Sequence, residues 1–147
     1  FPTELKNNTG DKLREIGNEF GATTGRKRRC GWLDLELVKF AKDLNGFNGI
    51  IITKLDVLDS FEEIKICTEY LLNGKQVSYA DCDTQMLSKV KPVYKSFKGW
   101  ESKTAGVTQF NRLPKEAKEY LKFIEKHLQI PIKFISTGNK RNETIKI

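Results

Sequence analysis

The chain has 147 residues, a net charge of +7, 38% apolar residues and 31% charged residues. This length can bury a core of its own, and the composition is typical of a folded globular protein. No apolar run approaches the roughly 18 residues that a membrane helix needs, and no signal-peptide pattern opens the sequence. Collagen-like, disulfide-framework and membrane-spanning classes are therefore excluded.

Cysteine and histidine are too few for a metal site. Cys30, Cys67 and Cys82 lack CxxC spacing and are odd in number, which favours a reducing compartment, and so a cytoplasmic location, over a zinc site or a disulfide framework. The single histidine, His127, leaves little room for histidine-based chemistry, and we interpret it as structural. We expect no cysteine- or histidine-based metal site within these 147 residues.

The positive charge is unevenly distributed along the sequence. The net charge is +3 over residues 1–31, −5 over 32–88 and +9 over 89–147. This asymmetry indicates an anionic ligand or a basic face. The lysines of the last segment are scattered, which favours a solvated surface there.

The first residues suggest a point inside a longer protein. Residues 1–5 include no initiator methionine and no helix-capping pattern. A short helix is predicted around 11–16, followed by a long ordered loop up to residue 31. Loops of this length inside a compact domain are uncommon unless they are functional.

A helix and a strand come next. The helix is predicted over 32–45 because apolar residues recur with helical spacing. Its stripe consists of Leu33, Leu37, Phe40, Ala41 and Leu44. The β-branched run at 49–52 is apolar on both faces, which is typical of a buried central strand of a parallel sheet.

The middle of the sequence predicts an antiparallel hairpin. Side chains alternate over 63–79, and Asn73-Gly74 is a strong hairpin-turn signal. Residues 80–92 read as a polar surface loop and 92–97 as a short strand. Residues 99–112 show no periodicity.

The clearest helix is predicted over 114–128, where Pro114 suits the first turn. Its buried stripe consists of Ala117, Tyr120, Leu121, Ile124 and Leu128. A strand at 132–135 and an edge strand at 144–147 complete the chain. The repeated order of helix, strand and loop predicts an α/β fold: a largely parallel sheet flanked by helices, with a small antiparallel excursion. Ligands bind at the carboxyl ends of strands in such sheets.

The first candidate site follows the isoleucine strand. In Thr53-Lys54-Leu55-Asp56, the Asp56 carboxylate has two acceptor oxygens for the ring N–H and amino group of guanine, and the Lys54 stem can cover the base. The motif is short, and a capped loop without a ligand explains it as well.

The second candidate loop is Ser136-Thr137-Gly138, after the other strand. Its small residues let backbone amides approach a ligand such as the guanine carbonyl oxygen. A plain glycine turn is the alternative interpretation.

The third candidate is the basic loop 21–29, which combines glycines, two threonines and four consecutive cations. Threonine hydroxyls and arginine forks suit bidentate capture of a carboxylate or phosphate. The alternative is a nucleic-acid-binding patch, but the aromatic residues that would stack on bases are missing here.

Other conspicuous residues are interpreted as structural. Trp32 and Trp100 are expected in the core. Five acidic residues are expected at the surface: Asp34, Glu36, Asp59, Glu62 and Glu63.

Together these motifs resemble the adenylosuccinate synthetases. The resemblance rests on the segments 1–5, 17–34, 53–59 and 135–138, in this order and spacing. It covers essentially the whole chain but only roughly the C-terminal third of the family's sequence, and it implies part of a P-loop-NTPase-like fold. It also implies a division into a substrate-loop region, 1–31, and a guanine-binding α/β part, 32–147.

The resemblance implies a ligase that joins IMP and L-aspartate, driven by GTP hydrolysis with Mg²⁺, in AMP biosynthesis. The implied aspartate and IMP contacts are Ala22, Thr23, Thr24, Gly25, Arg26, Lys27 and Arg28. The implied GTP contacts are Arg28, Lys54, Leu55, Asp56, Ser136, Thr137 and Gly138. Lys27 stands where many members have arginine, and Asn139 where proline is common.

The family's glycine-rich phosphate loop, catalytic Asp and His, and Mg²⁺ site have no counterpart in this sequence. The resemblance therefore implies that the chain by itself is inactive, and that the whole enzyme works as a homodimer without nucleic acid or membrane partners. Two alternatives stay open at this point: a stand-alone guanine-nucleotide-binding module and a basic nucleic-acid-binding domain.

Overall fold

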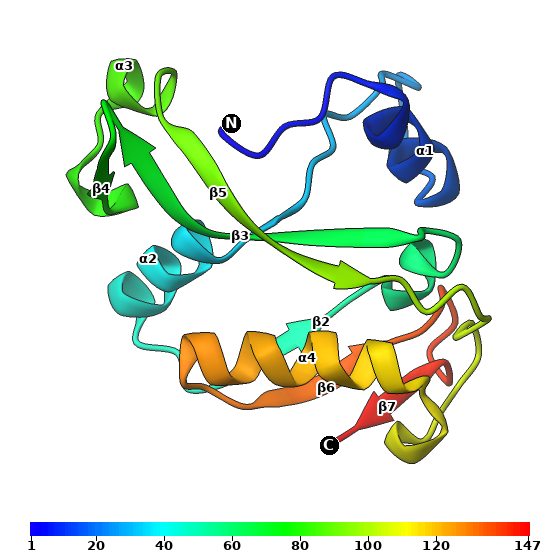
Figure 1. The fold of residues 1–147 in the computed structure, drawn as a ribbon. Helices are drawn as coiled ribbons and strands as arrows, with labels where there is room; N and C mark the ends of the chain where they lie inside the picture. Colours follow the sequence, from blue (N-terminus) through cyan, green and yellow to red (C-terminus); the bar gives the residue numbers. More distant parts are fainter. The chain divides into compact units, whose positions relative to one another are not determined.

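A computed structural model describes all 147 residues and divides them into two compact units. Unit 1 comprises residues 1–40 and 65–95, and unit 2 comprises 41–64 and 96–147. Figure 1 shows the order of helices and strands along the chain. The two units are described separately below.

Unit 1 is built around the long strand β3, Glu63–Leu72, which begins two residues before the unit does. β3 pairs in parallel with β1, Leu33–Asp34, and antiparallel with β4, Lys75–Val77. β5, Lys91–Lys98, also pairs with β3. The helical elements are α1, Asn8–Ile16; the first part of α2, Leu35–Asn45; and the short η2, Tyr79–Asp81, and α3, Thr84–Leu87.

The predicted hairpin at 63–79 is confirmed, and its turn has a clear local cause. Asn73 and Gly74 have φ angles of 52° and 79°. Two consecutive residues with positive φ form the type of turn that matches the twist of antiparallel strands, and Asn-Gly accepts these angles best. β3 and β4 are joined across this turn.

The core of unit 1 gathers Cys67 and Tyr70 of β3 and Val90, with a surrounding layer of partly buried apolar side chains. That layer consists of Leu72, Val77, Tyr79, Cys82, Leu87 and Tyr94. Burial raises the pKa of the Cys67 thiol to about 12. The cysteine is therefore a neutral apolar core residue rather than a nucleophile.

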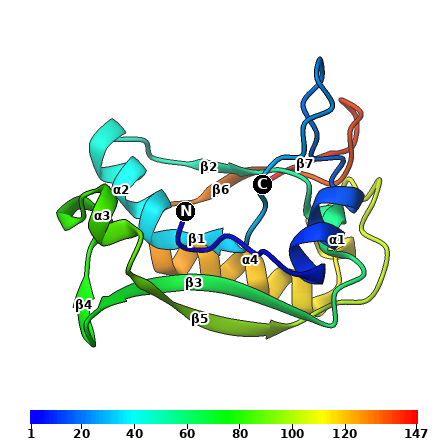
Figure 2. The ribbon, with the colours of Figure 1, turned by 90° about the horizontal axis from the view of Figure 1, so that it is seen from above.

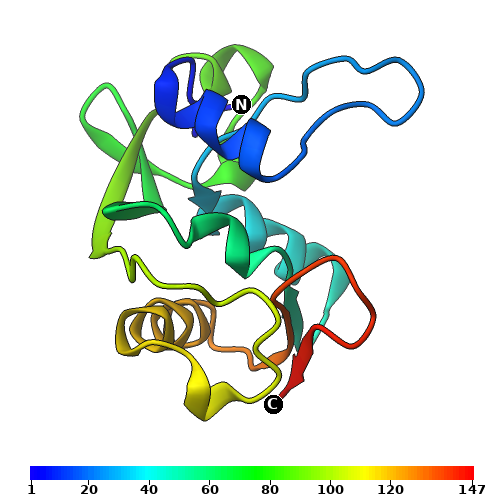
Figure 3. The same cartoon turned by 90° about the vertical axis from the view of Figure 1, so that its right-hand side faces the viewer.

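Unit 2 contains a second sheet in the order β2-β6-β7. β2, Ile50–Ile52, is parallel to β6, Ile132–Ser136, and β6 is antiparallel to β7, Thr144–Lys146. The helix α4, Lys115–Leu128, runs beside β6 (Figures 1 and 3). The 3₁₀ helices η1, Leu55–Leu58, and η3, Phe110–Arg112, complete the unit.

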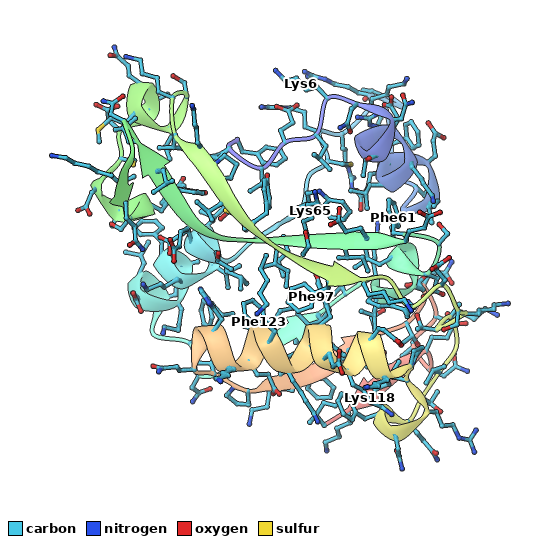
Figure 4. The ribbon with its side chains drawn as sticks, viewed as in Figure 1. Lys6, Phe61, Lys65, Phe97, Lys118 and Phe123 are labelled. Carbon is cyan, nitrogen blue, oxygen red and sulfur yellow. The ribbon has the colours of Figure 1, made fainter.

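The predicted buried stripe of α4 is confirmed, because each of its five residues is buried. Ile132, Ile135 and Ile145 of the sheet are buried as well. Phe97 and Phe123 point toward each other in Figure 4, with ring centroids 5.1 Å apart, and Phe97 also meets the edge of Tyr120. Trp100 is buried as predicted, and so is Trp32 in unit 1.

The prediction of one largely parallel sheet is wrong in detail. There are two sheets, and both mix parallel with antiparallel pairs. The parallel pairing of the strands at 50–52 and 132–136 is confirmed. However, β2 is an edge strand of its sheet and Ile51 is 61% exposed, so its run of isoleucines is not buried on both faces.

Two local predictions also need correction. The predicted helix over 32–45 begins only at Leu35, because Leu33 and Asp34 pair with β3 as a strand. Its buried residues include Leu35 and Glu36, whereas Leu37 and Leu44 of the predicted stripe are exposed. The segment 80–92 is not a plain loop, since η2, α3 and the start of β5 fall within it.

No helix in the structure combines the length and the apolar character that crossing a membrane requires.

Candidate functional site

The first candidate loop leaves strand β2 and turns directly into η1. Lys54 caps this 3₁₀ helix in the left-handed region, with φ 58° and ψ 40°. Left-handed backbone is unfavourable for a residue with a Cβ and often marks functional turns. Lys54 is exposed, Leu55 is buried, and Asp56 is half-buried within the first turn of η1.

Asp56 is the most unusual polar group of unit 2. Its Oδ1 atom is buried and has no hydrogen-bond partner. Burial raises the pKa of the Asp56 carboxyl, Asp59 and Glu143 raise it further, and the Asp56 backbone amide and Lys54 lower it. A buried acceptor without a donor costs free energy, so a ligand that supplies N–H donors here would remove a penalty that the protein otherwise carries.

The second candidate loop lies at the same edge of the sheet, because β2 and β6 are parallel neighbours and η1 lies next to β6. Ser136 donates its hydroxyl proton to the Gly138 carbonyl at 2.7 Å, which closes the turn. A Cβ at Gly138 would lie 2.2 Å from Glu143 Oε2, so a larger residue here would have to displace the Glu143 side chain. The structure thus brings the two predicted guanine loops together.

Thr137 faces inward rather than toward a ligand. It is fully buried, its amide donates to the Glu143 carbonyl at 2.9 Å, and its hydroxyl donates to the Val107 carbonyl at 2.8 Å. The Gly138 amide has no acceptor in the chain. Of the amides of Thr137 and Gly138, the latter is therefore the one available to a bound base.

The basic loop in unit 1 is a narrow hairpin that extends away from α1 (Figures 2 and 3). Phe20 and Lys27 form an antiparallel bridge, and the Gly21 amide donates to the Arg26 carbonyl at 2.9 Å. Gly25 occupies the left-handed region at φ 64°, which allows the tight return. Residues 22–29 are all exposed, so their side chains are available to a ligand.

Two of the four consecutive cations are paired within the chain. Arg28 binds Glu19 at 2.9 Å, and Arg29 holds Glu4 through two hydrogen bonds of 2.8 and 2.5 Å. The hydrogen bond from Arg29 lowers the pKa of Glu4 to about 2. Of the four cations, Arg26 and Lys27 make no ion pair within the chain, so their charges are the ones available to an external anion.

The hydroxyl of Thr24 accepts the Arg26 amide at 3.3 Å. This leaves the hydroxyl proton of Thr24 free to be donated. Together with the Arg26 guanidinium, it forms a donor set suited to a carboxylate. The resemblance places the aspartate substrate here, and the local geometry is compatible with it.

The first residues of the chain support the base of the basic loop. The Leu5 amide donates to the Cys30 carbonyl at 2.9 Å, and Glu4 pairs with Gly31 as an isolated bridge. A Cβ at Gly31 would lie 2.2 Å from the Thr3 carbonyl oxygen, which is why this close approach requires glycine. The first residues therefore support the base of the basic loop through backbone contacts.

The prediction that the acidic residues are all surface groups is wrong for three of them. Asp34 and Glu36 are buried, and Asp59 is half-buried with three hydrogen bonds. Asp34 accepts the hydroxyl of Tyr70 and the amide of Leu37. Sequence patterns could not predict these contacts, because the partners are distant along the chain. Tyr70 lies 36 positions after Asp34, and the partners of Asp59 lie 41 and 45 positions after it.

No group of three or more His, Cys, Asp or Glu side chains in the structure is arranged to hold a metal ion.

The fold defines a protein of mixed α/β class in which two candidate loops follow neighbouring parallel strands. A family model described as adenylosuccinate synthetase matches residues 1–145. The chain belongs to the adenylosuccinate synthetase family.

Individual relatives agree with this assignment. The adenylosuccinate synthetase of Aquifex aeolicus is 53% identical over 145 residues, which cover 99% of this chain and 34% of the relative. That of Schizosaccharomyces japonicus is 46% identical over 99% of this chain and 33% of the relative. A solved structure of fully ligated adenylosuccinate synthetase from Plasmodium falciparum has a TM-score of 0.95 at 38% identity, over 100% of this chain and 36% of that one. The chain thus spans about a third of the length of these relatives.

Proposed function

We propose that this chain supplies the guanine-binding and aspartate-binding parts of an adenylosuccinate synthetase, a GTP-dependent carbon–nitrogen ligase. Family membership gives the reaction class. The observation that carries the site assignment is the buried, unpartnered Oδ1 of Asp56 at the carboxyl end of β2.

In the proposed reaction, the γ-phosphoryl group of GTP is transferred to the 6-oxygen of IMP, which leaves GDP. The amine of L-aspartate then attacks C6 of the purine, the C6–O bond breaks, and phosphate leaves with adenylosuccinate as product. Mg²⁺, the catalytic acid–base groups and the IMP phosphate contacts come from the rest of the family's sequence in this proposal. The whole enzyme is proposed to be a cytoplasmic homodimer.

The guanine part is proposed to act through three groups. The Asp56 carboxylate accepts the ring N–H and the exocyclic amino group of guanine. The Lys54 stem covers one face of the base, and the Gly138 amide donates to the guanine carbonyl oxygen. Ser136 and Thr137 shape the loop that presents this amide, as their internal hydrogen bonds support.

The aspartate part is proposed to act through the exposed tip of the basic loop. Thr23 and Thr24 donate hydroxyl hydrogens to the substrate carboxylates, and Arg26 adds a charged fork that also reaches the IMP side. Lys27 contributes charge without fork geometry. Arg28 is proposed to touch GTP in the whole enzyme, and within this chain its guanidinium pairs with Glu19 at 2.9 Å.

Replacing Asp56 by asparagine tests the base assignment in a synthetase of full family length that carries this chain. Asparagine replaces one acceptor by a donor, so GTP should be rejected and xanthosine triphosphate (XTP) accepted better, since xanthine has a carbonyl in place of the amino group. Loss of one pair of this kind costs roughly 1–3 kcal/mol, or about 5- to 150-fold in the KM ratio of the two nucleotides.

The matched control is Asp43→Asn, because Asp43 is an exposed aspartate of the same unit, 3.6 Å from Lys42. This variant should keep the preference for GTP. An unchanged GTP/XTP preference in Asp56→Asn would remove Asp56 from the base site and with it the guanine assignment.

A further inference from the structure

The two candidate guanine loops are tied to a third segment of unit 2, residues 99–107, here called the strap. At one end, Asp59 Oδ1 accepts the indole N–H of Trp100 at 2.8 Å and the hydroxyl of Thr104 at 2.6 Å, and Asp59 Oδ2 accepts the Thr104 amide at 2.7 Å. Trp100 and Thr104 are both buried. The carboxylate of Asp59 thus holds the strap at two positions.

At its other end the strap is tied to the second loop. The Gly106 amide donates to the Thr137 carbonyl at 3.1 Å, and the Thr137 hydroxyl donates to the Val107 carbonyl at 2.8 Å. These two bonds run in opposite directions between the same short segments. They fix the position of Thr137, the residue between Ser136 and Gly138.

The last residues of the strap, 104–107, form a hydrogen-bonded turn. The Val107 amide donates to the Thr104 carbonyl at 3.0 Å, and Gly106 occupies the left-handed region at φ 79°. The start of the strap is also fixed, since the Gly99 amide donates to the Glu62 carbonyl at 2.7 Å. Thr104 and Val107 are therefore joined by a backbone hydrogen bond within the strap.

Asp59 lies one 3₁₀ turn after Asp56, and its amide donates to the Asp56 carbonyl at 3.2 Å. A chain of hydrogen bonds therefore runs from the turn of Asp56 through Asp59 and Thr104 to Thr137 and its neighbour Gly138. Recognition of a base by a carboxylate on one loop and an amide on another requires a separation fixed to within about 0.5 Å. The strap supplies such a fixed distance.

We propose that the strap sets the spacing of the two guanine loops, with Asp59, Thr104 and Thr137 as positioning residues for guanine recognition. This inference rests on the proposed function of the Asp56 site. None of the three side chains touches the base in this proposal, because their hydrogen-bonding groups are engaged with one another and with the backbone. They act on the nucleotide through Asp56 and Gly138.

The test uses Thr104→Val and Thr137→Val in a synthetase of full family length that carries this chain. Each replacement keeps the side-chain volume and removes one hydroxyl. Thr104→Ser and Thr137→Ser keep the hydroxyl, and Thr108→Val makes the same change at an exposed threonine beside the strap. The steady-state constants are measured with GTP and with inosine triphosphate (ITP), which lacks the 2-amino group that Asp56 is proposed to bind.

We expect each valine variant at positions 104 and 137 to raise the KM for GTP by about three- to tenfold, the effect of one hydrogen bond. The preference for GTP over ITP should fall by a similar factor, while the KM values for IMP and aspartate stay within about twofold of their original values. The serine variants should restore both quantities, and Thr108→Val should change neither.

Three results would overturn the proposal. The first is an unchanged GTP/ITP preference in both valine variants. The second is a parallel change of kcat and all three KM values with a lowered melting temperature, which would indicate general loosening. The third is failure of both valine variants to fold, which would make the strap a core element.

The outcome for Asp56→Asn separates this inference from the proposed function. If that variant switches from GTP to XTP while the valine variants leave the GTP/ITP preference intact, the guanine assignment stands and the strap proposal fails. If Asp56→Asn shows no switch, the assignment of the base site itself fails.

Discussion

The hydroxyl of Tyr70 donates to Oδ2 of Asp34 at 2.5 Å, and both side chains are buried. The other oxygen, Oδ1, accepts a hydrogen bond from the amide of Leu37 at 3.2 Å. Asp34 therefore also caps α2, because amides in the first turn of a helix have no acceptor within the helix. Asp34 lies only a few residues after the basic loop. The pair therefore fixes the point at which the chain leaves this loop and enters the core of unit 1.

Tyr70→Phe is predicted to destabilise the protein by about 1–3 kcal/mol at neutral pH, because it leaves a buried carboxylate oxygen without its donor. Chemical denaturation followed by circular dichroism measures the free energy of unfolding. Tyr79→Phe is the matched control, since Tyr79 lies in the same cluster and its hydroxyl makes no hydrogen bond within the chain. Equal losses in the two variants would contradict the role of the Asp34–Tyr70 bond.

The same variant has a predicted pH dependence. Burial raises the pKa of Asp34, while the hydrogen bond from Tyr70 lowers it. Loss of that bond raises the pKa further, so the folded variant binds the proton more tightly than the folded original protein does. The destabilisation is therefore fully present above the pKa of Asp34 in the variant and shrinks as the pH falls from there to the pKa of Asp34 in the original protein. A stability difference from the original protein that grows toward acid pH would contradict this sign.

Asp56 gives a second prediction, for nucleotide binding. Burial raises the pKa of this carboxyl in the free protein, and the proposed contact with guanine requires the ionised form. Nucleotide affinity should therefore fall on acidification at a pH above the usual range for an aspartate. Calorimetric titration with GTP across the acid range measures it. The residual GTP binding of Asp56→Asn should lack this decrease at acid pH, and a decrease that persists in the variant would assign the titration to another group.

The sequence predicts the position of the two candidate loops better than it predicts the sheets. Lys54 and Asp56 lie in one short motif and Gly138 in another, and the parallel pairing of β2 with β6 places both motifs at one edge, as expected. Helix α4 is likewise predicted, because its apolar residues recur with regular helical spacing. The structure confirms that this stripe is buried.

What the sequence misses depends on contacts between distant residues. Asp59 looks like a surface carboxylate until the fold brings Thr104 and Trp100 to it, 41 to 45 residues away in sequence. The apolar spacing of α2 predicts which face of the helix can be buried, but it does not specify what packs against that face. Leu44, on the predicted stripe, is 70% exposed. Internal partners for Arg28 and Arg29 are invisible for the same reason.

The left-handed backbone of Lys54 gives a third prediction, which separates stability from binding. Lys54→Gly should leave the melting temperature unchanged or raise it slightly, because glycine adopts φ 58° without a Cβ penalty. Affinity for GTP should fall, because the stem proposed to cover the base is lost. Gln129→Gly is the control, since Gln129 has φ 55° at the end of α4. It should share the effect on stability and leave GTP binding intact.

Arg26 provides the last prediction, on the aspartate part. Arg26 makes no ion pair and is exposed, so Arg26→Ala should leave the free energy of unfolding within about 0.5 kcal/mol of its original value. A hydrogen bond to a charged group contributes about 1.5–3 kcal/mol, so the KM for aspartate should rise by about 10- to 150-fold. The KM for GTP should change far less, and Arg112→Ala, at an exposed arginine of unit 2, should change neither. Steady-state kinetics with each substrate varied in turn makes the comparison. An equal rise in the two KM values would show that Arg26 supports the loop as a whole rather than the substrate carboxylate.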